Sequence, residues 1–296
     1  MPAIRLSPLG TPTGAAMAGP ATLEGDAPCV ALQGDADAGS GAGLRHAEFL
    51  AHRDGLVARV HSWELVTAVD GPGTRMTLFL NGCPLRCRYC HNPDTWRMRD
   101  GLTTTLEEIL ARVLRYRRIF EATGGGLTIS GGEPLLQSAF VGRLLREVHG
   151  RGIHTALDTS GYLGRRADDA MLREIDLVLL DVKSGIPAIY REVTGVDLRP
   201  TLVFGDRLAA AGIPVWIRFV LVPGLTDAPE NVEAVADLVE QWPNVARVEV
   251  LPFHQMGVSK WERLDLDYTL GQTQPPEPAL AERVREQFRA RGLTTY

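Results

Sequence analysis

The sequence is poor in cysteine, lysine and aromatic residues. It has 4 cysteines in 296 residues, which excludes the disulfide framework that stabilises many small secreted domains. No stretch approaches the roughly 18 consecutive apolar residues that a membrane span needs, and the N-terminus lacks the basic start and apolar run of a secretory signal. We therefore expect a cytoplasmic protein that makes no use of a membrane.

The charge balance argues against another class of partner. The chain has 31 Lys plus Arg against 36 Asp plus Glu, a net charge of -5 and a pI near 5.8. Without a basic stripe, the electrostatic field gives no reason to expect nucleic acid as a partner.

The N-terminal part of the chain differs in composition from the rest. Its first 43 residues contain 10 Ala, 8 Gly and 5 Pro, and the first aromatic residue is Phe49. Such a stretch cannot bury enough apolar surface to offset the entropy lost on ordering. We expect a disordered extension over residues 1–54, or translation from a start codon set too early, and a core domain over residues 55–296. Cys29 lies in the extension and receives no role.

From Leu56 onward, apolar runs alternate with segments of helical period. The runs cover residues 56–61, 75–80, 127–130, 153–158, 177–181, 214–222 and 245–251, and the helices are expected near 106–114, 136–149, 166–174, 200–211, 228–241 and 278–292. The clearest helix follows Thr105, which forms a capping-box pattern with Glu108. Setting aside the first run, six strand–helix repeats remain. They predict an α/β fold, an open (βα)6 partial TIM barrel with a parallel sheet.

The unusual residues follow the expected strands. Each of the six repeat strands ends just before one of these segments: the cysteine loop, 130–134, 158–161, 181–183, 223–224 and 252–254. Because the carboxyl ends of parallel strands share one edge, these segments should converge on the rim where such barrels build active sites.

Three cysteines are concentrated in eight residues. Cys83, Cys87 and Cys90 have the spacing C-x3-C-x2-C, which suits three irons of a cubic 4Fe-4S cluster and leaves the fourth iron open. The alternative is a structural zinc. Zinc favours a closed set of four ligands, and the chain has no second cysteine pair; His91 could serve only if the loop folded back sharply.

This cysteine pattern, with a Gly-Gly-Glu motif on the next strand, resembles the radical S-adenosylmethionine superfamily. Seven short runs are further similar to the pyruvate formate-lyase activating enzyme family, in order and approximate spacing: 59–63, 69–75, 89–92, 157–159, 180–183, 215–218 and 251–254. The resemblance extends from about Leu56 to the C-terminus.

The resemblance implies a chemistry and its cofactors. One 4Fe-4S cluster would bind S-adenosylmethionine at its open iron and donate one electron to the sulfonium. The resulting deoxyadenosyl radical would abstract hydrogen from a glycine of a partner enzyme. The partner would be a glycyl radical enzyme of the pyruvate formate-lyase type, and the reductant a flavodoxin or ferredoxin.

The resemblance also implies cofactor-binding residues along the rim. They are Tyr89, Cys90, His91, Gly131, Gly132, Glu133, Asp158, Asp181, Val182, Lys183, Arg218 and His254. Lys183 stands out because the chain has only one other lysine, Lys260. Asp158 and Asp181 are candidates for holding a monovalent cation beside the cofactor carboxylate. No catalytic residue is expected beyond the cluster and cofactor site.

For three of these residues, another role is compatible with the sequence. Glu133 could accept from the cofactor amino group or fix the strand-to-helix turn. Arg218 could meet a carboxylate of the cofactor, the partner peptide or a buried ion-pair partner. His254 could contact the cofactor or be a structural histidine.

A glycine-rich turn precedes the first repeat strand. By resemblance, Asp70, Gly71 and Arg75 receive the partner's glycine loop, with Asp70 accepting from peptide N–H groups; the alternative is a plain connecting turn.

Two other functions remain open from the sequence. One is a radical enzyme for a small molecule, such as a 7-carboxy-7-deazaguanine synthase, against which the 70–75 run counts. The other is a zinc-stabilised binding module. The 40 residues between Cys90 and Gly131 contain no cysteine, so the ferredoxin-like insert of many other activating enzymes is absent there.

Overall fold

The structure is a computed structural model that describes residues 41–67 and 69–296. The strands are β1 (Val57–Thr67), β2 (Arg75–Leu80), β3 (Leu102–Thr105), β4 (Gly126–Gly131), β5 (His154–Thr159), β6 (Leu177–Asp181), β7 (Val215–Leu221) and β8 (Val245–Pro252). The α-helices are α1 (Gly41–Arg53), α2 (Leu106–Arg115), α3 (Arg117–Thr123), α4 (Ser138–His149), α5 (Asp169–Leu172), α6 (Pro187–Thr194), α7 (Arg199–Ala211), α8 (Pro229–Val239), α9 (Val258–Arg263) and α10 (Pro278–Ala290). Within the described residues, no helix is long and apolar enough to cross a membrane.

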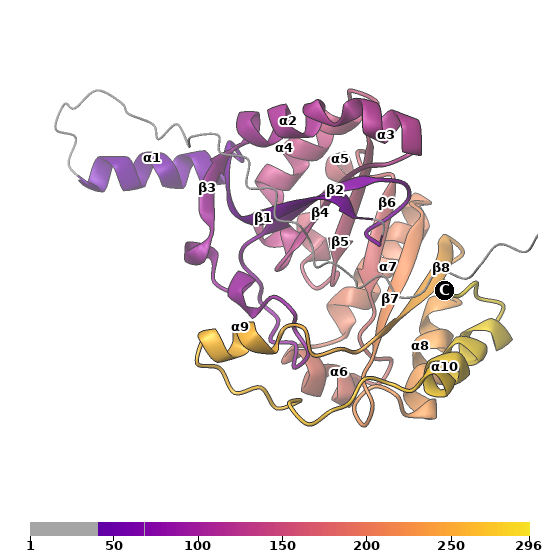
Figure 1. Cartoon of the computed structure of the whole chain (residues 1–296). Helices are drawn as coiled ribbons and strands as arrows, with labels where there is room; N and C mark the ends of the chain where they lie inside the picture. The colour runs from indigo at the N-terminus through magenta and orange to yellow at the C-terminus, as the bar shows by residue number, and fades with distance from the viewer. Residues whose placement is uncertain (1–40, 68) are drawn as a thin grey trace, which may run out of the picture. The chain divides into compact units, whose positions relative to one another are not determined.

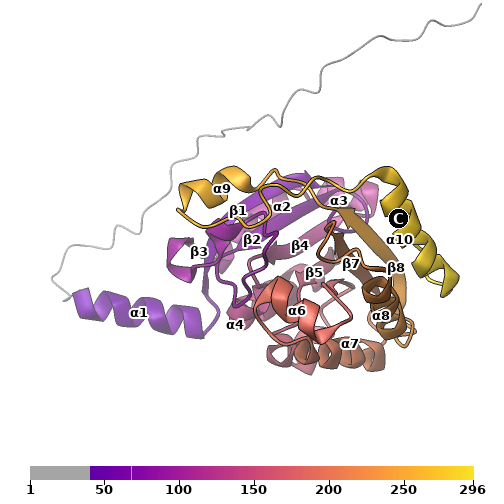
Figure 2. The same ribbon diagram turned by 90° about the horizontal axis from the view of Figure 1, so that it is seen from below.

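One sheet organises the described residues (Figure 1). Its strand order is β3-β1-β2-β4-β5-β6-β7-β8. The strands from β2 to β8 in this order pair in parallel, whereas β1 pairs antiparallel with both β2 and β3. The strands follow an arc with α4, α7 and α8 on its outer side (Figure 2). The expected open (βα)6 barrel is therefore confirmed, with β1 and β3 added at one edge.

Alternation along the strands directs one set of side chains to the main core and places several charged groups on the opposite, inner face, beside a small apolar cluster of Ala156, Leu177 and Leu179. On β7, Val215, Ile217 and Phe219 are buried in the main core. The intervening residue Arg218 meets carboxylates of β5 and β8 instead. The inner face thus carries the polar groups of the barrel, because successive side chains of a strand point to opposite faces.

The expected helices are present, and their bounds differ by a few residues. The capping box at Thr105 and Glu108 is formed. Helix α5 is shorter than the expected 166–174, because Asp168 is its N-cap and the helix covers only Asp169–Leu172. Strand β3 and helices α3, α6 and α9 escape prediction because each is too short to establish a hydrophobic period.

The proposed extent of the disordered extension needs a correction. Residues 41–53 form α1, although they belong to the stretch expected to lack structure. The reason is tertiary: the Glu48 carboxylate accepts from Arg59 Nη2 at 2.5 Å and from Thr103 Oγ1 at 3.0 Å. The rest of the expected extension, residues 1–40 with Cys29, lies outside the described residues.

Close packing between α7 and Trp242, in the loop after α8, yields a stability test. A Cβ at Gly205 would lie 2.2 Å from Cζ2 of Trp242, whereas one at Gly43 in α1 would have no neighbour within 4 Å. We expect Gly205→Ala to lower the free energy of unfolding by about 1–3 kcal/mol through overpacking. Gly43→Ala should be neutral or raise it by up to about 1 kcal/mol. Thermal unfolding of both variants checks this, and equal behaviour would contradict it.

Candidate functional site at the carboxyl ends of the strands

The cysteine loop follows β2 and is fixed by backbone hydrogen bonds. Gly82 N donates to Thr95 O at 2.6 Å, and Arg88 N donates to Val193 O at 3.0 Å. The loop packs into an apolar cluster at this rim, whose buried members are Leu85, Cys87, Tyr89, Val193, Val222, Phe253 and Leu270, with Cys83 and Cys90 packed against it. All three thiols are free of disulfide bonds.

The surroundings of the thiols disfavour their ionised forms. Burial raises the pKa of Cys83, Cys87 and Cys90, that of Cys87 to about 12, although the charge of Lys183 opposes the rise at Cys87 and Cys90. Among the described residues, no three His, Cys, Asp or Glu side chains are arranged to hold a single metal ion. The thiols therefore form an apolar, low-dielectric site in which positive charge is needed to stabilise thiolates.

A second segment, around α9, holds the cysteine loop from the other side. Trp261 Nε1 donates to the Cys90 carbonyl oxygen at 2.8 Å. Lys260 Nζ donates to Asn92 Oδ1 at 2.7 Å and pairs with Asp94 at 3.1 Å. The sequence offered one signal for this contact, since Lys260 is one of two lysines, but no pattern linked it to a loop 160 or more residues earlier.

Gly131 and Gly132 are required by close approach of the chain to itself. Gly131 has φ +121, and a Cβ there would lie 2.2 Å from Leu80 N; a Cβ at Gly132 would lie 2.4 Å from Gly82 O. The glycines thus let the end of β4 pack directly against the start of the cysteine loop. A side chain would separate two parts of the predicted site.

Glu133 is 1% exposed and has no free acceptor position. Its Oε1 accepts from Thr159 Oγ1 at 2.6 Å and Leu135 N at 3.2 Å, and its Oε2 accepts from Ser160 Oγ at 2.5 Å and Ser160 N at 3.0 Å. A carboxylate has about four acceptor positions. The structure therefore favours the turn-fixing alternative for Glu133 over contact with a cofactor.

The Asp-Val-Lys run after β6 divides into two environments. Lys183 is 7% exposed, and its ammonium pairs with Asp181 Oδ2 at 2.7 Å and lies 5.6 Å from the centre of the Tyr89 ring. Burial opposes its charge, but Asp181, Tyr89 and Cys87 together outweigh burial and raise the pKa of Lys183. Val182 instead lies in the main core, and its N–H donates to Arg218 O at 3.1 Å.

Arg218 is a buried ion-pair centre. Its guanidinium pairs with Asp70 at 3.1 Å, Asp158 at 3.3 Å and Glu249 at 3.3 Å. Asp158 also accepts from Ser130 Oγ at 2.6 Å. The structure favours the ion-pair alternative for Arg218. It also gives protein cations to both carboxylates that we considered for a monovalent cation, Asp158 and Asp181.

The prediction that Arg75 contacts a partner peptide is wrong. Arg75 is 0% exposed, and its guanidinium donates to Thr128 Oγ1 at 2.6 Å, Leu127 O at 2.7 Å and Pro72 O at 3.1 Å. Gly71 is also buried, with φ +124, and a Cβ there would lie 2.9 Å from Arg75 Cδ. Arg75 therefore supports the turn from beneath, and only Asp70 of the three retains polar groups near the barrel interior.

Two predicted histidines meet beside the last cysteine. The rings of His91 and His254 lie 4.0 Å apart, and His91 Nε2 lies 3.3 Å from the His254 carbonyl oxygen. Burial lowers the pKa of both. Two buried atoms at this rim, His254 Nδ1 and the Tyr89 hydroxyl, have no hydrogen-bond partner among the described residues. Both are free to form a hydrogen bond with a bound molecule, as is the buried Asn81 Oδ1 at the end of β2.

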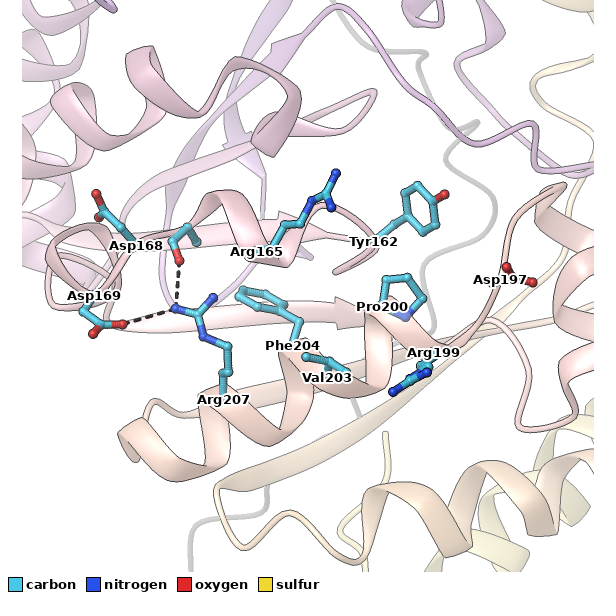
Figure 3. Close-up of a pocket in the computed structure, with 11 residues that line it drawn as sticks. Tyr162, Arg165, Asp168, Asp169, Asp197, Arg199, Pro200, Val203, Phe204 and Arg207 are labelled. Carbon is cyan, nitrogen blue, oxygen red and sulfur yellow. Dashed lines mark hydrogen bonds and ion pairs between the residues drawn. The ribbon is translucent and has the colours of Figure 1, made fainter.

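A separate cavity of about 610 Å³ lies on the outer side of the barrel (Figure 3). Phe204 and Val203 of α7 line it, and Arg207 crosses one end to donate to Ala167 O and the Asp169 carboxylate. None of the residues predicted for the site lines this cavity.

Comparisons with known proteins identify the family of the chain. Residues 77–239 match the model of the radical SAM superfamily. The chain is 46% identical over 215 residues to the pyruvate formate-lyase-activating enzyme of Clostridium pasteurianum, covering 73% of this chain and 90% of that protein. It is 40% identical over 233 residues to the pyruvate formate-lyase 1-activating enzyme of Escherichia coli strain K12, covering 78% and 94%.

Solved structures share the fold. A radical SAM methyltransferase from Sphaerobacter thermophilus matches with TM-score 0.53 and 18% identity, covering 81% of this chain and 76% of that one. SuiB of Streptococcus suis, bound to its precursor peptide SuiA, matches with TM-score 0.54 and 17% identity, covering 72% and 46%.

The buried Asp158 gives a pH-dependent test. Burial raises its pKa from 3.8 to about 6, although Arg218 acts in the opposite direction. The folded protein then binds this proton more tightly than the unfolded chain, so the carboxyl's contribution to stability is largest below pH 4 and is lost as pH rises through about 6. Asp158→Asn removes this dependence. The melting temperature of the variant minus that of the wild type should rise between about pH 4 and pH 6. A difference that stays constant with pH would contradict the assignment.

Proposed function

The chain belongs to the radical SAM superfamily and within it to the pyruvate formate-lyase activating enzymes, and from that premise we propose that it activates a glycyl radical enzyme of the pyruvate formate-lyase type. The observation that carries the proposal is the loop of three free thiols, fixed in an apolar cluster at the rim that also presents Lys183. The small-molecule and zinc alternatives have no such support, because the relatives are activating enzymes matched over most of their length.

The residues of the rim fit the cofactors of this family. When bound, the 4Fe-4S cluster and S-adenosylmethionine supply a deoxyadenosyl radical by one-electron cleavage of the sulfonium, and that radical takes hydrogen from a glycine. Cys83, Cys87 and Cys90 would hold three of the irons. The apolar surroundings that disfavour free thiolates suit thiolates whose charge a cluster offsets, and they keep water from the reacting groups.

Other residues of the rim bind and orient the cofactor. The Lys183 ammonium supplies a buried positive charge for the cofactor carboxylate, and Asp181 holds that ammonium in place. The unpartnered His254 Nδ1 and Tyr89 hydroxyl supply polar contacts on the side of His91. Glu133 acts through Ser160 and Thr159 by keeping the Gly131–Gly132 turn against the cysteine loop.

The proposal also names a docking residue for the partner enzyme and a class of reductant. Asp70 would receive the glycine loop of the glycyl radical enzyme at the barrel interior, and a flavodoxin or ferredoxin would supply the electron. The reductant is tested by replacing a chemical reductant with each reduced protein in turn and measuring deoxyadenosine release. If neither reduced protein supports deoxyadenosine release, both are removed from the proposal.

The cluster ligands give the first functional prediction. Cys87→Ala should lose the iron and sulfide of the cluster, its brown absorbance near ~400 nm and all cofactor cleavage, because one of three thiolates is missing. Cys83→Ala and Cys90→Ala should behave alike, and Cys29→Ala serves as the matched control with normal iron content. A Cys87→Ala protein that reconstitutes a full cluster and cleaves S-adenosylmethionine would refute the ligand set.

Lys183 gives the second functional prediction. Lys183→Met keeps much of the side-chain volume but removes the charge, so the dissociation constant for S-adenosylmethionine should rise about tenfold to a hundredfold. Iron content should stay normal, which separates cofactor binding from cluster assembly. Binding is measured by titration of the reconstituted protein, and an unchanged dissociation constant would place Lys183 outside the cofactor site.

A further inference from the structure

Arg218 connects three parts of the chain that the sheet order keeps apart. Its Nη2 donates to Val69 O at 2.5 Å and to Asp70 Oδ1 at 3.1 Å, both in the turn between β1 and β2. Its other nitrogens pair with Asp158 of β5 and Glu249 of β8. The turn belongs to a hairpin near one end of the open sheet, whereas β7 and β8 form the other end. The guanidinium therefore bridges the open side of the barrel.

The geometry requires an arginine. The side chain of Arg218 is 10% exposed and uses Nε and both Nη groups toward acceptors that come from different directions. A planar guanidinium has five donors in a fixed fork, while an ammonium is a point charge with three. A lysine here would keep the positive charge and lose the simultaneous contacts.

The turn itself is the least constrained of the three attachments. Asp158 and Glu249 lie on strands of the sheet, whereas Asp70 lies in a turn with Gly71 and Gly73 at positive φ. The main hold on the Asp70 carboxylate, besides Thr77 Oγ1 at 3.1 Å, is the pair with Arg218. Thr128 Oγ1 also donates to Asp70 O at 2.6 Å, and Arg75 donates to Pro72 O at 3.1 Å. Removing the pair with Arg218 should therefore loosen the turn around the Asp70 side chain while leaving the strands paired.

We propose that Arg218 is a positioning residue for partner recognition: it holds the Asp70 turn across the open side of the barrel, so that the Asp70 carboxylate stands ready for the partner's glycine segment. The inference rests on the proposed function for the identity of that segment. It assigns Arg218 to the support of the turn and not to the binding of the cofactor. The Arg218 side chain then links Asp70, which would contact the partner, to Asp158 inside the barrel.

The experiment compares Arg218→Lys, Asp70→Asn and the double variant with the wild type, all as reconstituted full-length protein. Asp70→Asn keeps an acceptor oxygen but loses the charge that pairs with Arg218. The matched control is Arg207→Lys, which removes the fork of an arginine with three contacts outside the barrel. Three quantities are measured: amide hydrogen exchange over residues 69–77, affinity for a synthetic peptide of a pyruvate formate-lyase glycine loop, and affinity for S-adenosylmethionine.

Both single variants should exchange amide hydrogens faster in this segment and bind the peptide about tenfold to a hundredfold more weakly. Cofactor affinity should change by a smaller factor, which a general loss of structure would not produce. The double variant should bind the peptide no more weakly than the weaker single variant, because the two residues act as one unit. Arg207→Lys should match the wild type.

Several results would overturn the proposal. These are unchanged exchange of the turn in both variants, losses of peptide affinity that multiply in the double variant, or a loss of cofactor affinity as large as that of peptide affinity. If Arg218→Lys does not fold, Asp70→Asn alone decides through exchange and peptide binding. If the wild type forms no glycyl radical with any pyruvate formate-lyase, the proposed function fails, whereas exchange of the turn needs no partner and still decides the role of Arg218.

Discussion

The parallel pairing of six strands is the constraint on which the site depends. From β2 to β8 each strand runs in the same direction, so the segments that follow them all emerge at one edge. The cysteine loop, the Gly131–Gly132 turn and the Asp181–Lys183 pair share this edge for that reason. Stable strands hold the rim rigid, and the loops can then be specialised for cofactor binding.

Buried charges fix the geometry inside this frame. Glu133, Arg75 and Arg218 are at least nine-tenths buried, and each is surrounded by complementary groups. A buried charge without partners is costly, so each of these networks permits few alternative arrangements. Glu133 fixes the turn beside the cysteine loop, Arg75 supports the Asp70 turn, and Arg218 closes the open side. Two of the buried polar groups without a partner among the described residues, at Tyr89 and His254, lie where the cofactor is proposed to bind.

The cysteine loop shows how distant parts of the chain share one task. It is held by its own backbone, by the end of α6 through Thr194 and Val193, and by Lys260 and Trp261 of α9. The C-terminal segment thus stabilises a loop that lies near the start of the domain. Because the relatives match this chain over nearly their whole length, the complete domain and not the cysteine loop alone is the functional unit.

The sequence by itself determined the repeat of strands and helices, the cluster loop and the rim residues, because hydrophobic period and cysteine spacing are local properties. It left the roles of Glu133 and Arg218 open, and the family resemblance assigned Arg75 to contact with the partner's glycine loop although that residue is 0% exposed. Only the tertiary structure decided these cases. Whether a charged side chain faces a ligand or a buried partner depends on which segments fold against it, and Thr159, Asp158 and Leu127 lie 26 to 60 residues away in the chain. The contact of Lys260 with the cysteine loop, the helix at residues 41–53 and the bridge from Arg218 to Asp70 were decided in the same way, since long-range packing leaves no periodic trace in the sequence.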